Sequence, residues 1–449
     1  MISTQFNTHR DYANYFYENH KLIFKCTSFK DNIWYHFKNQ KWRHDIEGNS
    51  LKKRIEKDCI KKHLTDIDNL KKVIELETDQ NNVKEYEKMI ANFCRSIQKL
   101  KLHQFKNGIM AECREIFYDD TFENKLDTNI HLIGFNNGVY DLNTKQLRNT
   151  EPDDYIRLST CIDYIEFTGL EPVFEEILIF FEQLFPNQHQ FALLFLSSFL
   201  EGNKMECLFN IWFGVNGPSG KSTLLCLLKK SFGEYCERIP VDFLNQKISS
   251  VNFNHEKNLK GVRLCIAEEF GNFRQLELEN IKSWINNYPI NRKILYHFEP
   301  KKFNPQFKII YCCAENMPII SDRTHLNSFS EIKVTSFNSR FVDYPNSNWG
   351  TPRSKDAFQI GCTETPLFQT VFPKGVTLNR SKDSDVDLIP PDSNLNPWIY
   401  SHEYKRDRHL HEKLDNWKQP FMYMIFQYHQ LYMSNGLSIA KNINEQYSD

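Results

Sequence analysis

The spacing of hydrophobic positions changes several times along the 449 residues, and each change predicts a different kind of element. Apolar and polar side chains alternate over 31–37, which predicts a strand of a small α/β unit. From 46 to 117, apolar residues recur at helical spacing among many Lys and Glu, without a Pro. This pattern predicts charge-rich helices whose polar faces are solvated.

The middle of the chain is expected to return to strands. Asn137-Gly138 lies between two apolar runs, which is a hairpin signal. Residues 170–202 indicate one or two apolar helices, and 208–213 a buried strand that enters a Gly-rich turn. Two further apolar strands are expected, one ending at Glu268-Glu269 and one at 307–313.

The last hundred residues differ in character. Residues 345–397 hold seven of the 17 Pro together with polar runs, so a long irregular insertion or linker is expected there. From Trp398 onward, the spacing of apolar residues predicts helix again.

Composition narrows the class of protein. A formal net charge of -1 excludes a protein that coats nucleic acid through bulk charge, so any such contact must be a local patch. No apolar run reaches the ~18 residues of a membrane span, and the first residues have no secretory pattern. The 12 Cys include no C-x-x-C pair. We therefore expect a globular intracellular protein with reduced, mostly buried thiols and no membrane partner.

One segment has the residue types and spacing that can bind phosphate. Gly214-Val-Asn-Gly-Pro-Ser-Gly-Lys-Ser-Thr223 follows an apolar strand and precedes an apolar helix, which is the context of a phosphate-binding loop. Backbone N–H groups of such a loop and the helix N-terminus favour phosphate, Lys221 can reach the β- and γ-phosphates, and Ser222 can ligate Mg²⁺. ATP and Mg²⁺ are the expected cofactors. The expected nucleotide-binding residues are Asn216, Gly217, Pro218, Ser219, Gly220, Lys221, Ser222 and Thr223.

Acidic and polar residues at the ends of neighbouring strands would complete this site. Glu268 and Glu269 come 47 and 48 residues after Lys221, a plausible strand-helix-strand separation. One carboxylate, assigned to Glu268, would hold the metal, and Glu269 would polarise the attacking water. Asn316, just after the third strand, is a weaker candidate for a contact with the γ-phosphate.

The order of these motifs resembles the superfamily 3 helicase core, and more narrowly the helicase part of the poxvirus-type helicase-primase of nucleocytoplasmic large DNA viruses. Lys221-Ser222 matches the Walker A motif, Glu269 the Walker B glutamate, and 337–345 the end of the core. Shorter matches at 34–42, 135–142 and 414–422 extend the resemblance over most of the chain except 346–397. The resemblance implies an α/β fold with an AAA+-type P-loop ATPase core, a parallel sheet flanked by helices, after a mainly α-helical or α+β N-terminal region.

The resemblance also suggests five segments and a set of partners. The segments are an α-rich region (1–125), a pre-helicase domain (126–202), the ATPase core (203–345), an irregular insertion or linker (346–397) and a truncated helical C-terminal segment (398–449). The long relatives' primase domain is expected to be missing upstream. Implied partners are single-stranded DNA, five further copies in a homo-hexamer, and a primase, polymerase or other replication proteins. Implied locations are the host cytoplasm or nucleus, at viral replication sites.

Three departures from the family pattern bear on activity. Val215 stands at the first Walker A glycine, Glu315 at the sensor asparagine, and Ser330-Glu331 at a pair of arginines. An arginine finger is worth about 10³–10⁵ in rate, so its loss would permit ATP binding and cripple hydrolysis. Arg323 and Arg340 are the nearby candidates to replace it.

The DNA contact is the least specific prediction. A basic run between the acidic strand and the sensor strand could line the pore of a ring, although a solvated basic turn would look the same. Its members are Arg292, Lys293, His297, Lys301 and Lys302.

Three functional hypotheses follow. The first is an ATP-dependent DNA helicase of viral replication, working as a ring with ATP hydrolysed between subunits. The second is a degenerate paralogue that binds nucleotide with little or no hydrolysis and serves as a DNA-binding or assembly subunit. The third, a P-loop kinase of small molecules, is disfavoured by the matches outside the core.

Overall fold

The computed structural model describes residues 6, 8–186, 189–203, 207–214, 218–245, 259–268, 275–286, 288–292, 301–313, 319–321, 332–337, 339–344 and 402–437. The chain forms two compact units. Unit 1 comprises Met1–Leu126 and Thr150–Arg157, and unit 2 comprises Asp127–Asn149 and Leu158–Asp449. The five-segment division remains a prediction.

Unit 1 combines a small antiparallel sheet with helices. The sheet has the order β1 (Phe24–Ser28), β2 (Ile33–Lys38) and β3 (Lys41–Ile46), so the alternating run did predict a strand. Against it pack α1 (His9–His20), α4 (His103–Ile116) and the short α5 (Phe122–Lys125). Thr8 and Asp11 form a capping box that fixes where α1 begins.

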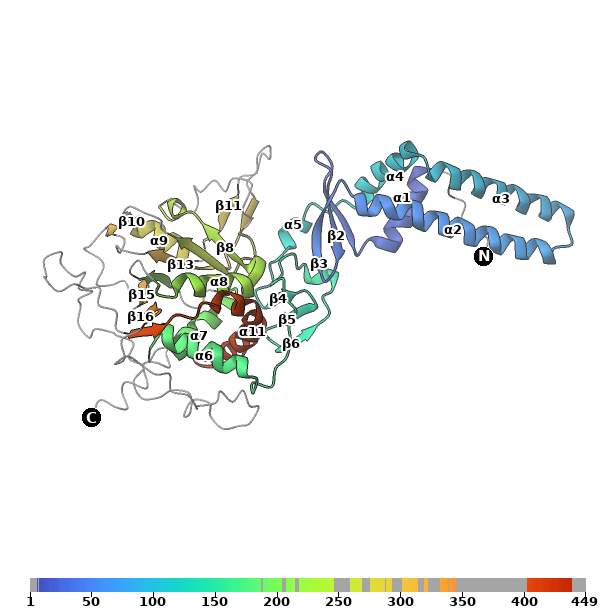
Figure 1. The fold of residues 1–449 in the computed structure, drawn as a ribbon. Coiled ribbons are helices and arrows are strands. Elements are labelled where there is room, and N and C mark those ends of the chain that lie inside the picture. The colour runs from blue at the N-terminus through green and yellow to red at the C-terminus, as the bar shows by residue number, and fades with distance from the viewer. Residues whose placement is uncertain are drawn as a thin grey trace. The chain divides into compact units, whose positions relative to one another are not determined.

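Two long helices of unit 1 form a hairpin. α2 (Asn49–Leu76) and α3 (Gln80–Leu100) lie side by side and extend beyond the rest of the unit (Figure 1). Their shared core contains Ile67, Leu70 and Phe93, all buried. Helical spacing over 46–117 therefore predicted α2, α3 and α4 correctly.

Unit 2 is built on a five-stranded parallel sheet. Its strands are β7 (Phe209–Phe213), β8 (Cys236–Ile239), β9 (Leu264–Glu268), β13 (Lys308–Cys313) and β15 (Ile332–Ser336). They have the order β15-β7-β13-β9-β8. Strands β7, β9 and β13 are buried almost throughout, because parallel sheets are covered on both faces. The α/β class with a parallel sheet and flanking helices is thereby confirmed.

Helices cover this sheet. On one side α6 (Pro172–Leu184), α7 (His189–Ser197), α8 (Lys221–Phe232) and α11 (Leu410–Asn435) gather together (Figure 1). α9 (Leu278–Ile285) lies next to the small parallel pair of β10 (Gln275–Glu277) and β14 (Ile319–Ser321). No helix in the described part of the chain has the length and apolar character needed to cross a membrane.

Three further strand groups complete unit 2. β4 (Leu132–Phe135), β5 (Gly138–Asp141) and β6 (Gln146–Arg148) form an antiparallel sheet, and Asn137-Gly138 lies at its first turn as predicted. β11 (Ile290–Arg292) pairs with β12 (Lys301–Phe303). β16 (Ser339–Val342) pairs in parallel with β17 (His402–Lys405). The expectation of helix from Trp398 onward was therefore wrong at 402–405, where β16 supplies a partner that local spacing cannot reveal.

Candidate nucleotide-binding site

The Gly-rich segment lies between strand and helix, as its sequence predicts. β7 ends at Phe213, Gly214 follows, and α8 begins at Lys221. Gly220 has a φ of +80°, a left-handed conformation that favours glycine at the turn into the helix. Three expected loop positions, Val215, Asn216 and Gly217, lie outside the described residues.

Residues 218–220 of this loop contact β16 and α6. The Phe341 N–H donates to the Pro218 carbonyl oxygen over 2.8 Å. A Cβ on Gly220 would lie 2.4 Å from the Leu184 Cδ2 and 3.0 Å from the Phe341 Cε2. Ser219 is buried beside these groups, with 3 % of its surface exposed. Residues 218–220 therefore pack closely against β16 and α6.

The first turn of α8 is left without a side-chain cap. The first N–H groups of a helix have no partner inside it, so they and the helix dipole favour an anion at this end. Ser222 is exposed and Thr223 half-buried in the same turn. The expected phosphate-binding residues that the structure describes thus surround an uncapped helix N-terminus.

Lys221 reaches from this helix to the next strand. Its Nζ donates to the Cys313 carbonyl oxygen, at the end of β13. Burial lowers the pKa of Lys221, while the nearby Cys312, Cys313 and Glu268 oppose that shift. The ammonium group is thus held close to the carboxyl ends of β13 and β9.

Glu268 is the acid that the structure brings to this edge. Cys313 of β13 is in register with Phe213 of β7, and Cys312 with Glu268 of β9, so the three strands end at one level. The Glu268 carboxylate lies 3.5 Å from the guanidinium of Arg238, on β8. Within the described residues, no cluster of three His, Cys, Asp or Glu could hold a metal ion by itself.

The structure places only some of the remaining predicted site residues. Those that lie outside the described residues are Glu269, Lys293, His297, Asn316 and Arg323. For Arg292, Lys301 and Lys302 only the backbone is described, and it puts Arg292 opposite Lys301 in the β11–β12 pair. Arg340 lies on β16, with 45 % of its side chain exposed, 3.6 Å from Glu403.

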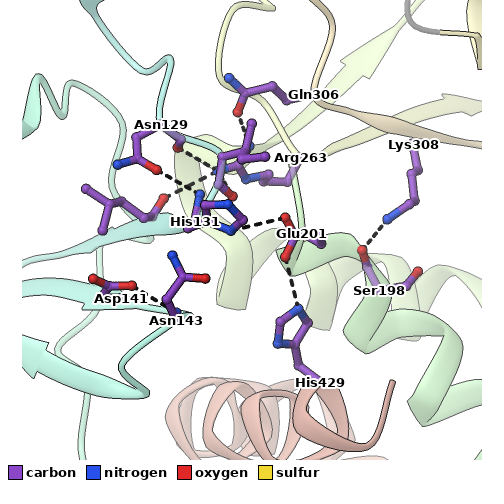
Figure 2. Close-up of polar contacts among 12 residues, drawn as sticks. Asn129, His131, Asp141, Asn143, Ser198, Glu201, Arg263, Gln306, Lys308 and His429 are labelled. Atoms are coloured by element: carbon purple, nitrogen blue, oxygen red, sulfur yellow. Dashed lines mark hydrogen bonds and ion pairs between the residues drawn. The ribbon is translucent and has the colours of Figure 1, made fainter. Parts of the chain in front are cut away.

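Sequence reasoning missed a second polar cluster, at the opposite edge of the sheet (Figure 2). Glu201 is 2 % exposed, and its two oxygens lie 3.4 Å from His131 Nδ1 and 3.6 Å from His429 Nε2. Buried Arg263 donates to the backbone oxygens of Asn129, Ile130 and Leu132 and to Gln306. Burial acts to raise the pKa of Glu201, but His429, His131 and Arg263 outweigh it and hold that pKa below its ordinary value.

This cluster joins parts of unit 2 that are far apart in sequence. His131 comes just before β4, Glu201 directly follows the 3-10 helix Ser198–Leu200, and His429 lies on α11. A lone Glu after an apolar run was the only sequence signal, and it does not identify its partners. The hydrogen bonds of Arg263, just before β9, connect it to Gln306, just before β13, and to the backbone of 129–132.

Known proteins resemble both units. Residues 13–183 match the family described as D5 N terminal like. Putative helicase L207/L206 of Acanthamoeba polyphaga mimivirus is 29 % identical over 98 % of this chain and 41 % of that protein. Putative helicase 184R of Invertebrate iridescent virus 6 is 26 % identical over 81 % of this chain and 37 % of that protein. Putative primase C962R of African swine fever virus (strain Badajoz 1971 Vero-adapted) is 23 % identical over 75 % and 36 %.

These matches confirm the resemblance to the helicase-primases of large DNA viruses. The chain spans about two fifths of the length of the curated relatives it matches. Among solved structures, the apo C-terminal region of NrS-1 covers 63 % of this chain and 53 % of that chain, with 10 % identity and a TM-score of 0.34. A likeness at that level carries no functional argument.

Proposed function

We propose that unit 2 binds ATP and Mg²⁺ at the carboxyl edge of its parallel sheet and hydrolyses the nucleotide as a superfamily 3 helicase core. The observation that carries the proposal is the convergence of Lys221, the uncapped first turn of α8 and Glu268 at one level of the sheet. The Gly-rich loop follows β7, which lies between β15 and β13 in the sheet. The loop therefore lies at the carboxyl ends of inner strands, where open α/β sheets bind ligands.

The residues present fit a magnesium nucleotide. Mg²⁺ is usually held by one or two carboxylates together with substrate phosphates and water, and does not require an all-protein cage. One carboxylate, Glu268, and one exposed hydroxyl, Ser222, lie at this edge. The absence of a three-ligand cluster among the described residues is therefore compatible with the proposed metal. Bound Mg²⁺ would neutralise charge on the phosphates.

Each side chain then has a distinct task. Lys221 exchanges its hydrogen bond to the Cys313 carbonyl oxygen for one to a phosphate oxygen, which its position on the first turn of α8 allows. Glu268 lies on the proposed metal side of the site, and the resemblance assigns activation of water to its neighbour Glu269. Gly220 lets the backbone turn toward the phosphates without a side chain in the way.

The names of the relatives support a role in viral DNA replication. Several are called putative helicase and others putative primase. We propose that the chain, alone or as part of a longer protein, moves along single-stranded DNA as a homo-hexameric ring with replication proteins as partners. The β11–β12 pair, which brings Arg292 opposite Lys301, is the proposed pore element.

A second candidate is a nucleotide-binding paralogue with little or no hydrolysis. Ser330-Glu331 replaces the expected arginines, and Arg340, a possible substitute, is engaged by Glu403. Such a subunit would bind ATP and assemble, with turnover near zero because no arginine stabilises the transition state.

An ATPase assay with and without single-stranded DNA, run beside native mass measurement, tests these proposals. We expect DNA-stimulated turnover that is lost in Lys221→Ala and kept in Lys230→Ala. Lys230 is a matched control because it lies on the same helix, and the ion pair that the described residues give it, with Asp415, is partly exposed. Binding without turnover would select the second candidate. No binding of ATP by the folded wild type would refute both.

A further inference from the structure

Four cations form a row along the exposed side of α3, and the exposed Glu85 and Glu87 lie on either side of this row around the helix. Lys84, Lys88, Arg95 and Lys99 are all exposed, and at 100° per residue they fall within about 60° of one another around the helix. The first and the last, Lys84 and Lys99, are 15 positions apart, or about 22 Å along the axis. The opposite face of α3 holds Phe93 and Leu100, which are buried. We call the four cations the α3 basic face.

The described structure shows no ion pair to the α3 basic face. None of its four residues lies at ion-pair distance from a carboxylate, and Arg95 donates only to the Asn92 side chain. From 88 to 111 the sequence contains five Lys or Arg and no Asp or Glu. The pairs Lys84/Lys88 and Arg95/Lys99 put like charges four residues apart, which destabilises a helix. Fold stability alone therefore does not account for the arrangement.

The face also lacks stacking side chains. The aromatic residues of α3, Tyr86 and Phe93, belong to the core shared with α2. Proteins that hold single strands combine cations with exposed aromatic rings, whereas a duplex offers a dense ladder of phosphates and stacked, inaccessible bases. A straight row of cations without rings suits the duplex backbone.

We propose that the α3 basic face binds the phosphate backbone of duplex DNA without sequence preference. The contact lies in unit 1 and needs neither nucleotide nor the pore element, so it goes beyond the proposed ATPase. It would hold the unopened duplex while a single strand enters the motor. Phosphate contacts of this kind position a protein and carry no sequence information.

Fluorescence anisotropy on the full chain, with a labelled 25-base-pair duplex and no nucleotide, tests the proposal. Four phosphate contacts give a slope of about -3.6 in log K against log salt, or about 150-fold in affinity between 50 and 200 mM salt. We expect Lys84→Gln/Lys88→Gln/Arg95→Gln/Lys99→Gln to remove a slope of that size. Unchanged thermal melting of the variant would show that the hairpin still folds.

A variant with the same change in net charge is the control. Lys53, Lys57, Lys61 and Lys72 are exposed on α2 and have no ion-pair partner, so their replacement by Gln removes four charges from the same hairpin. Equal losses in both variants would refute a specific face, because bulk charge would explain them. A larger loss on a single-stranded probe than on the duplex would refute the choice of duplex. Lys221→Ala is expected to retain duplex binding. A failure of the ATPase proposal is therefore distinguishable from a failure of this one.

Discussion

Gly220→Ala, which adds a single methyl group, should both destabilise unit 2 and weaken the proposed nucleotide binding. Its φ of +80° costs an alanine about 1–2 kcal/mol. The new Cβ would lie 2.4 Å from the Cδ2 of Leu184, which is itself 1 % exposed and closely surrounded. Overpacking a core commonly costs about 1–3 kcal/mol. We therefore expect Gly220→Ala to lower the free energy of unfolding of unit 2 by about 2–4 kcal/mol.

The same methyl group should weaken nucleotide binding. The backbone can relieve the strain only by moving the loop, which disturbs the hydrogen bond from Phe341 N–H to the Pro218 carbonyl oxygen. We expect at least a tenfold rise in the Kd for a fluorescent ATP analogue. Urea unfolding followed by tryptophan fluorescence gives the stability, and titration of the folded variant gives the affinity.

A double-mutant cycle separates the two causes. Leu184→Ala alone should cost about 2–5 kcal/mol, because it opens a cavity. In Gly220→Ala/Leu184→Ala that cavity accepts the methyl group, so the combined loss should fall short of the sum by about 1–3 kcal/mol. Additive losses, or a Gly220→Ala variant within 0.5 kcal/mol of wild type, would refute the structural reasoning.

Three further outcomes are expected. Glu201→Gln should lower the free energy of unfolding at pH 7 by about 3 kcal/mol, since it breaks a buried charged cluster. The pKa of Glu201 in the folded protein lies below its ordinary value of 4.5, so the wild type loses this contribution as the pH falls through that folded pKa. Urea unfolding at pH 3–7 should therefore show the free energies of unfolding of the two proteins converging in acid. Arg238→Ala should change the free energy of unfolding by less than about 1 kcal/mol, because the ion pair of Arg238 with Glu268 is partly exposed. It should also lower the Mg²⁺ concentration that half-saturates ATP binding. An unchanged Mg²⁺ dependence would contradict a metal role for Glu268. Among the described thiols, Cys94 and Cys161 are exposed and should be alkylated first, while burial raises the pKa of Cys113 to about 12 and keeps it unreactive, as peptide mass spectrometry would show.

The parts of the fold that could be predicted are those with a local cause. β7, β9 and β13 are buried on both faces, so each is a short apolar run that stands out in the sequence. The helices of unit 1 were predictable from spacing, and the first hairpin of unit 2 from Asn137-Gly138. The Gly-rich segment was visible because its chemistry needs specific residues at fixed distances.

The rest depends on contacts between distant segments. β17 exists because β16 pairs with it, and its residues show no strand pattern of their own. Phe341 contacts the loop from 123 residues further along the chain than Pro218, and Leu184 from 36 residues before Gly220. Glu201 gives no hint of His131 or His429 in the sequence. Local patterns predict elements, whereas the sites that join elements follow only from their packing.

The parallel pair of β16 and β17 brings together two points of the chain that are 60 positions apart in sequence, Val342 and His402. Once both ends of a connection are fixed, the entropy of closing it grows only with the logarithm of its length, by about 0.6 kcal/mol for each doubling. By this relation, a reporter domain inserted between the two strands would add little to the entropy of closing the β16–β17 pair. Since Phe341 of β16 also holds the loop at Pro218, such a reporter would be attached within a few residues of the proposed nucleotide site.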